Sequence, residues 1–347
     1  MGNNSGQLPG KRSYRYLKVI LSLAFGIFLL WLISRDQDFE LIFNEVREAN
    51  YFWIILAAVF AAMSHLLRAL RWNVLVNSLG YNANTWQSFN AVMIGYLSNL
   101  AVPRLGEITR CVMLGRLTKA PINSLFGTVV AERVFDMFTL MAILALTIAF
   151  QYEFLKSFLY RFFVSPLMIM ETKGWWYLMV ILLIAIILLT AAFLFIKRKL
   201  STSESGGFYY KLKRQVTGLK NGMLTIWTIK RKVLFIFYSI LIWMCYLLTV
   251  YFCFFAIEAT AHLSIQAAVT LLAVGSLGIV APVPGGIGTY HFLTILTLTE
   301  LYGIVSEPAT SYAYISHAIQ TLVIIIIGSA AWFSISFQKK TGNISHV

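Results

Sequence analysis

The chain has 347 residues, of which 59% are hydrophobic and only 12% are charged. Soluble globular domains carry about 25% charged residues, so this composition excludes a soluble protein and indicates a polytopic membrane protein. The 28 Lys and Arg residues outnumber the 14 Asp and Glu residues, but they lie beside apolar segments of membrane-spanning length. We therefore interpret the positive charge as a signal of membrane topology and not as a nucleic-acid binding surface.

Six apolar segments have the length that crosses a bilayer as one helix. They are residues 17–34, 51–70, 122–150, 175–196, 233–257 and 310–336. The first of them follows a basic stretch and has no small-residue cleavage site after it, so we expect an uncleaved span instead of a signal peptide.

Two further apolar segments, residues 86–117 and 264–304, are broken near the middle by proline and glycine. The breaks contain Pro103, Gly106, Pro282, Pro284, Gly285, Gly286 and Gly288. Each arm is short for a full crossing, and broken backbone is tolerated at membrane depth only where it faces protein or a polar cavity. We expect an all-α membrane protein in which both segments are re-entrant hairpins.

The distribution of basic residues predicts the topology. With the N-terminus inside, most Lys and Arg residues fall on the cytoplasmic side, which places both termini in the cytoplasm and the chain in the plasma (inner) membrane. Two full crossings for each broken segment would keep the same sidedness, so that alternative stays open. An odd number of crossings in the first half inverts the second half, the repeat plan of secondary transporters.

The expected organisation follows from these segments. It comprises a cytoplasmic tail (1–16), a first span with an external loop (17–50), repeat 1 (51–200), a cytoplasmic amphipathic linker (201–232), repeat 2 (233–338) and a second cytoplasmic tail (339–347). Residues 206–229 and 152–163 have amphipathic patterns typical of helices on the inner and outer leaflet. Packing against the bundle explains both patterns equally well.

The segment 122–150 contains three ionisable residues, Glu132, Arg133 and Asp136. Each costs roughly 2.5 to 3.5 kcal/mol inside a membrane helix, so each needs a partner or a function. Glu132 and Asp136 are four residues apart and share one helix face. One interpretation is an internal ion pair that locks this span to the first hairpin.

The alternative is a binding site that includes Arg104, Glu107 and Arg110 of the first hairpin. A helix that begins just after Gly106 points free backbone N–H groups into the protein, and with Arg104 this makes an anion site suited to a phosphate headgroup. Glu107 in the first turn could instead cap the helix as a built-in anion. The two interpretations remain open here.

Among the polar residues of the second half, His291, His317 and Gln320 are the best placed to face Glu132 and Asp136 across the repeat axis. In contrast, His65 and Arg68 are expected near the membrane interface, with Arg68 extended toward the headgroups.

No cofactor or metal site is expected. Cys111, Cys245 and Cys253 lack metal-ligand spacing, and the glycine-rich break lacks the spacing of a nucleotide-binding loop.

Three sequence strings together resemble the lysylphosphatidylglycerol synthase transmembrane-region family, also called flippase-like membrane proteins. The strings are NLAVPRLGEITR at 99–110, Glu132-Arg133-x-x-Asp136, and PVPGGIG at 282–288. The resemblance covers residues from about 15 to 336. It implies two inverted repeats and movement of phospholipid between leaflets, and it matches Pro103, Arg104, Gly106, Glu107, Glu132, Arg133, Asp136, Pro284, Gly285, Gly286 and Gly288.

Two departures limit what this resemblance implies. The sequence ends at Val347 directly after the last span, so we expect no soluble aminoacyl-transfer domain and no synthase activity. Many relatives also carry an acidic residue after the glycine-rich turn, where this chain has His291, which leaves the lipid unassigned.

The leading hypothesis is a flippase-like protein, not an enzyme, that moves a phospholipid or lipid-linked headgroup through a polar cavity between the hairpins. Its partners would be anionic or zwitterionic membrane lipids. The alternatives are an intramembrane transferase with Glu107 or Asp136 as general base, and a non-catalytic membrane scaffold. The lipid, the direction of movement, ion coupling and the oligomeric state are not determined by the sequence.

Overall fold

A computed structural model describes residues 37–150, 231–281 and 283–340, together with residues 20, 24, 26–32, 35 and 229. Throughout these ranges the secondary structure is helical, without strands. The predicted span 175–196, segment 152–163, nearly all of 206–229, both chain ends (1–16 and 341–347) and Pro282 lie outside the described residues. The first predicted span is described in part, with helix at 26–32.

Four long helices form the frame of the molecule. They are α3 (Tyr51–Ser78), α6 (Ile122–Phe150), α11 (Lys232–Phe254) and α14 (Ser306–Lys340). Among the described residues, α3, α11 and the part of α14 up to Ser336 are long and apolar enough to cross a membrane. Helices are thus present at four of the predicted spans, 51–70, 122–150, 233–257 and 310–336, although α3 continues eight residues beyond the predicted end at residue 70.

The segment before α3, predicted as an external loop, contains a ten-residue helix, α2 (Phe39–Glu48). The Asp38 side chain accepts hydrogen bonds from the N–H groups of Glu40 and Leu41, which satisfies donors that a helix start leaves free. Gln37 donates to Ser306 Oγ at 2.7 Å and so ties the segment before α2 to the start of α14.

The first broken segment forms a helical hairpin of α4 (Thr85–Ala101) and α5 (Leu105–Thr118), which pack against each other. Two glycines face each other in this contact. A Cβ atom built on Gly106 would collide with the carbonyl oxygen of Gly95, and one built on Gly95 would lie 2.9 Å from the carbonyl oxygen of Gly106. The close approach of the two backbones thus requires glycine at both positions.

The second broken segment forms a corresponding hairpin of α12 (Ile265–Val280), a short 3-10 turn η3 (Pro284–Gly286) and α13 (Thr289–Glu300). Gly285, Gly286 and Gly288 have φ values of +60°, +75° and +84°. Only glycine adopts this left-handed region without steric cost, which explains why the break is rich in glycine.

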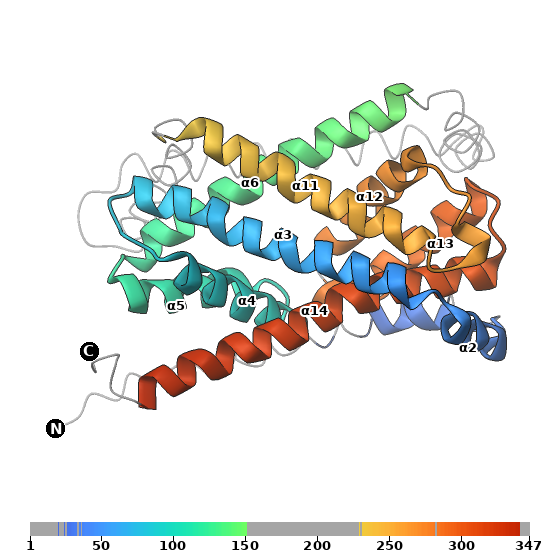
Figure 1. Cartoon of the computed structure of the whole chain (residues 1–347), viewed down its shortest axis with the longest axis horizontal. Coiled ribbons are helices and arrows are strands. Elements are labelled where there is room, and N and C mark those ends of the chain that lie inside the picture. Colours follow the sequence, from blue (N-terminus) through green and yellow to red (C-terminus); the bar gives the residue numbers. More distant parts are fainter. Residues whose placement is uncertain are drawn as a thin grey trace, which may run out of the picture.

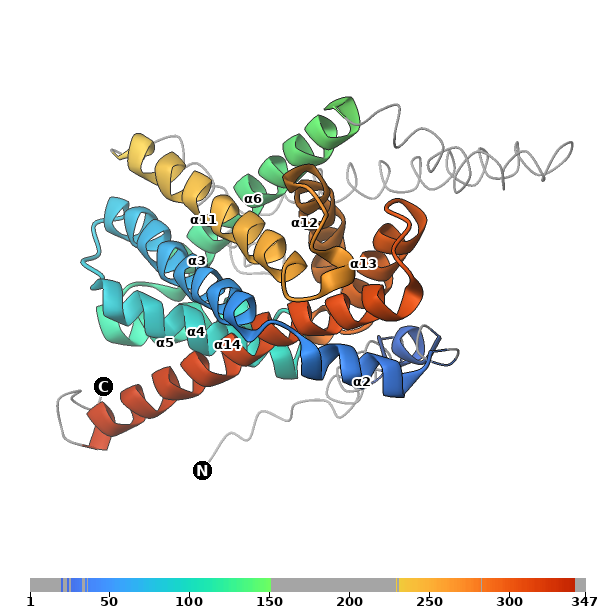
Figure 2. The same cartoon turned by 45° about the vertical axis from the view of Figure 1, so that its right-hand side comes forward.

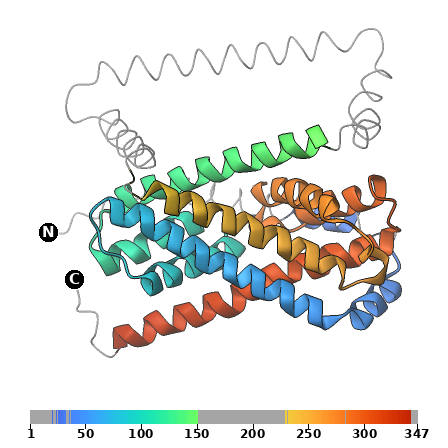
Figure 3. The same cartoon turned by 45° about the horizontal axis from the view of Figure 1, so that its top comes forward.

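The two hairpins enter the molecule from opposite ends. In Figure 1 the α4–α5 hairpin opens toward the end where α3 terminates, and the α12–α13 hairpin opens toward the other end. Their tips meet, because α4 contacts η3 and a Cβ built on Gly285 would lie 3.1 Å from Leu100 Cδ2. The helices α3 and α11 run side by side in all views (Figure 1, Figure 2 and Figure 3).

Each hairpin packs into its own apolar core. The core around α12 and α13 includes Ala57 of α3, whereas the core around α4 and α5 includes Ala69 and Trp72 of α3. Between these contacts, α3 carries the buried polar residues Ser64, His65 and Arg68. The polar interior therefore lies where the two cores adjoin.

The outward faces of the long helices are apolar. Their exposed side chains include Phe52, Ile55 and Val59 of α3, Phe138 and Met141 of α6, Ile236 and Ile240 of α11, and Ile326 and Phe333 of α14. Such contiguous apolar surface is typical of contact with lipid and is rare on soluble monomers. Together with the span lengths it identifies an integral membrane protein.

We predict that Gly106→Val separates α4 from α5 and lowers the thermal stability of the purified protein. Overpacking a close contact costs about 1–3 kcal/mol. Ala101→Val, which adds similar volume at an exposed position of α4, serves as the control and should leave the unfolding temperature unchanged. Equal unfolding temperatures for both variants would contradict the close contact.

Candidate functional site

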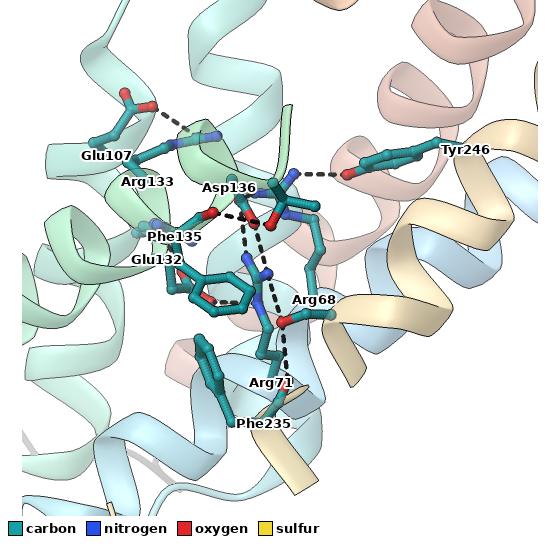
Figure 4. A network of polar contacts seen from close by, with 12 residues as sticks. Arg68, Arg71, Glu107, Glu132, Arg133, Phe135, Asp136, Phe235 and Tyr246 are labelled. Carbon is teal, nitrogen blue, oxygen red and sulfur yellow. Dashed lines mark hydrogen bonds and ion pairs between the residues drawn. The ribbon is translucent and has the colours of Figure 1, made fainter. Parts of the chain in front are cut away.

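A network of buried charges joins α3, α5, α6 and α11 (Figure 4). Arg71 of α3 lies at its centre and contacts Asp136 with both terminal nitrogens, at 2.6 Å from Nη1 to Oδ1 and 3.0 Å from Nη2 to Oδ2. Its Nε lies 3.4 Å from Glu132 Oε1. The side chains of Arg71 and Glu132 are 0% and 1% exposed, so this network is inside the protein.

Two further arginines extend the network. Arg68 donates to Asp136 Oδ2 at 2.8 Å and to the Tyr246 hydroxyl of α11 at 2.6 Å. Arg110 of α5 donates to Glu132 Oε2 at 3.0 Å. Each carboxylate of α6 is thus shared by two arginines: Asp136 by Arg68 and Arg71 of α3, and Glu132 by Arg71 and by Arg110 of α5. This pairing lowers the cost of burying them.

A fifth ion pair is more accessible. Arg133 Nη2 lies 2.9 Å from Glu107 Oε1, with side chains 40% and 21% exposed. Two ion pairs, Arg133–Glu107 and Arg110–Glu132, therefore connect α5 to α6. The predicted span 122–150 is therefore linked to the first hairpin by ion pairs, as the first interpretation expects.

Aromatic side chains surround the arginines. The guanidinium groups of Arg71, Arg68 and Arg110 lie over the rings of Phe235, Tyr96 and Trp72 at 5.5, 5.8 and 4.9 Å. Trp72 donates to Thr128 Oγ1 at 2.9 Å, which fixes its ring between α3 and α6. These contacts hold the charged groups in defined positions within an otherwise apolar interior.

The start of α5 differs from the open anion site considered above. The N–H of Gly106 already donates to the Asn99 side chain at 2.6 Å, and Glu107 occupies the first turn of the helix. Arg104 lies at the hairpin tip, exposed, with a left-handed φ of +63° and no side-chain cap. Asn99 thus supplies the hydrogen-bond acceptor, and Glu107 the negative charge, that an external anion would otherwise supply at this helix start.

Two histidines of the second half, His291 and His317, form a separate cluster at the second hairpin. The rings of His291 and His317 are 4.6 Å apart, His291 Nδ1 accepts from the N–H of Gly288 at 3.3 Å, and His317 Nε2 lies 2.8 Å from the Gly285 carbonyl oxygen. Gln320 donates to the Ser316 carbonyl of its own helix. Within the described residues, no hydrogen bond or ion pair connects these three side chains to Glu132 or Asp136.

Two sequence-based expectations about α3 were wrong. His65 and Arg68 are not interfacial, since they are 9% and 8% exposed and Arg68 pairs with Asp136 inside the bundle. Arg71 was not among the predicted site residues, because the span was ended at residue 70. The sequence signal that could have identified Arg71 is its three-residue spacing from Arg68. This spacing places both arginines on one helix face once α3 continues to Ser78.

The fold and this site define an integral membrane protein with two helical hairpins and a buried arginine–carboxylate network that joins α3, α5 and α6. The chain belongs to the Lysylphosphatidylglycerol synthase TM region family, whose sequence profile matches residues 19–328. The resemblance found in the sequence is thereby confirmed. No solved structure matches the chain significantly.

Several curated proteins are similar to the chain. A UPF0104 membrane protein of Pyrococcus horikoshii is 23% identical over 79% of this chain and 83% of its own length. A UPF0104 membrane protein of Methanocaldococcus jannaschii is 30% identical over 34% of this chain and 35% of its own length. A protein named Glycosyltransferase AglD of Haloferax volcanii is 26% identical over 37% of this chain and 21% of its own length. The matches to M. jannaschii and Methanothermobacter thermautotrophicus each span about a third of those relatives.

We predict that the cost of removing a carboxylate follows its burial. Glu132→Ala leaves Arg110 and Arg71 with less neutralising charge inside the bundle and should destabilise the protein by about 3–5 kcal/mol. Glu107→Ala, whose partner Arg133 is much more exposed, should cost about 1 kcal/mol or less. Denaturant unfolding of the detergent-solubilised variants measures both values, and equal losses would argue against the network as the main internal constraint.

Proposed function

We propose that this protein moves a phospholipid or lipid-linked headgroup between the two leaflets of the membrane, with the charged network as the polar part of the path. The observation that carries the proposal is the burial of three arginines and one carboxylate, Arg68, Arg71, Arg110 and Glu132, among apolar helices, with Asp136 paired to two of these arginines. Ionisable groups inside a membrane bundle are expensive and commonly mark a substrate pathway.

The depth of the network supports this proposal. Arg68 lies ten residues before the C-terminal residue of α3, and Glu132 lies ten residues after the N-terminal residue of α6. These two helix ends lie at the same end of the molecule (Figure 1). At 1.5 Å per residue the charges lie about 15 Å along the two helices from that end, well inside the bundle.

The hairpins support it as well. We infer that α4–α5 and α12–α13 are re-entrant hairpins of an inverted repeat, entering from the cytoplasmic and the external side, within a chain of six full crossings. Secondary transporters place their substrate where two such broken segments meet, near the middle of the bilayer. Here the hairpin tips meet at Leu100 and Gly285. Both chain ends would then be cytoplasmic.

An intramembrane transferase is the second candidate, favoured by the match to the protein named Glycosyltransferase AglD. Glu107 or Asp136 would be the general base of such a reaction, and Glu107 is paired with Arg133. However, Asp136 pairs with two arginines. The positive charges stabilise its ionised form, so the carboxylate accepts a proton less readily and is a weaker base. The geometry therefore favours a binding role for this carboxylate.

We predict that Asp136→Asn abolishes exchange of headgroup-labelled phospholipid between leaflets in liposomes that contain the purified protein. The amide keeps the shape of the carboxylate but removes the charge that Arg68 and Arg71 share. Glu40→Gln, which removes an exposed carboxylate from α2, is the matched control and should exchange lipid at the normal rate.

Size-exclusion profiles and unfolding temperatures would establish that both variants are folded. Exchange that survives in folded Asp136→Asn protein would exclude the network from the path. Formation of a glycosylated lipid from a sugar donor, lost in the same variant, would favour the transferase.

A further inference from the structure

The charged network contains one more arginine than carboxylates among its described residues. Its members are Arg68, Arg71, Arg110, Arg133, Glu107, Glu132 and Asp136. Three arginines match three carboxylates: Arg71 with Asp136, Arg110 with Glu132, and Arg133 with Glu107. Arg68 shares Asp136 with Arg71 and has no carboxylate of its own within the network, so it carries the surplus positive charge.

The polar groups around Arg68 lack partners. Arg68 Nε, His65 Nδ1 and the Tyr96 hydroxyl are buried and have no hydrogen-bond partner among the residues that the structure describes. The ring of Tyr96 lies 5.0 Å from the ring of His65 and 5.8 Å from Arg68 Cζ, so the three side chains adjoin. Buried polar groups are almost always paired, and three unpaired groups in one place call for an explanation.

These three groups have a common chemistry. The guanidinium Nε and the tyrosine hydroxyl are donors, and an imidazole nitrogen donates when it carries the proton. A surplus positive charge surrounded by donors favours an acceptor with negative charge, and arginine recognises phosphate oxygens especially well. A phosphodiester carries a single negative charge, which equals the surplus on Arg68.

We propose that His65, Arg68 and Tyr96 form a subsite for a phosphate-type oxyanion. The inference rests on the proposed function where the oxyanion belongs to a lipid headgroup, and inorganic phosphate shares the same chemistry. Tyr96 belongs to α4 and His65 and Arg68 belong to α3, so the bound oxyanion bridges the first hairpin to the frame. Asp136 pairs with Arg68 at 2.8 Å and orients its guanidinium.

The subsite is tested by the protection that a ligand gives against thermal unfolding, because a ligand that binds only the folded state raises its stability. Full-length protein in detergent is titrated with phosphatidylglycerol, with diacylglycerol of the same chains, and with inorganic phosphate. We expect phosphatidylglycerol to raise the unfolding temperature and diacylglycerol, which has no phosphate, to have no such effect. If inorganic phosphate also protects the protein, the subsite binds a phosphate-type oxyanion of either source. If only phosphatidylglycerol protects it, the subsite binds the phosphate of a lipid headgroup.

Three variants make the test specific. Arg68→Gln should weaken the apparent affinity for phosphatidylglycerol about tenfold or more, the value of one charge-assisted hydrogen bond, and Tyr96→Phe should weaken it while leaving the ring in place. Arg68→Lys, which keeps the charge, should retain part of the protection. Arg47→Gln and Tyr51→Phe remove the same groups at exposed positions of α2 and α3 and should bind normally.

Equal protection of Arg68→Gln, Tyr96→Phe and the unaltered protein would overturn the subsite, and so would equal protection by diacylglycerol. The outcome is separable from that of lipid exchange. Phosphate-dependent protection without exchange would keep the subsite and reject translocation, whereas exchange that Arg68→Gln retains in full would reject the subsite and keep translocation.

Discussion

The interior of this bundle depends on the contact of Arg71 with Asp136 and Glu132. A carboxylate in an apolar interior is tolerated only with a close counter-charge, and Arg71 supplies one to both acids of α6 at once. Its Nη1 also donates to Ser239 of α11 at 3.2 Å, so one guanidinium connects three helices. Through Glu132 and Arg110 the same constraint reaches the first hairpin.

The two hairpins bring the charged groups and the chain breaks together inside the bundle. Glycine at 95 and 106 lets α4 and α5 approach closely, which brings Arg110 within reach of Glu132. The left-handed glycines at 285, 286 and 288 turn the second hairpin so that its tip reaches α4. Polar groups from both halves are then enclosed between apolar cores, the arrangement that a path for a lipid headgroup requires if the acyl chains stay in the bilayer.

Much of this could be predicted from the sequence, and the failures have physical causes. Helix positions followed from long apolar runs and from Pro/Gly breaks, and the pairing of α6 with the first hairpin followed from the cost of burying Glu132, Arg133 and Asp136. The partners on α3 did not, because HLLRALRW has the composition of a span end. Only tertiary packing shows that α3 continues and that Arg68 and Arg71 face inward. The expected contact of His291 and His317 with the carboxylates failed similarly, since burial favours the nearest counter-charge and arginine supplies it.

The most direct measurement is leaflet exchange by the unaltered protein in liposomes of otherwise pure phospholipid. A headgroup-labelled anionic phospholipid is incorporated into both leaflets, and a membrane-impermeant reductant then bleaches the label from outside. Our account predicts that bleaching continues beyond the share of the outer leaflet, because the protein brings inner-leaflet lipid to the surface. Bleaching that stops at the outer-leaflet share, as in protein-free liposomes, for anionic and zwitterionic lipids alike would contradict it.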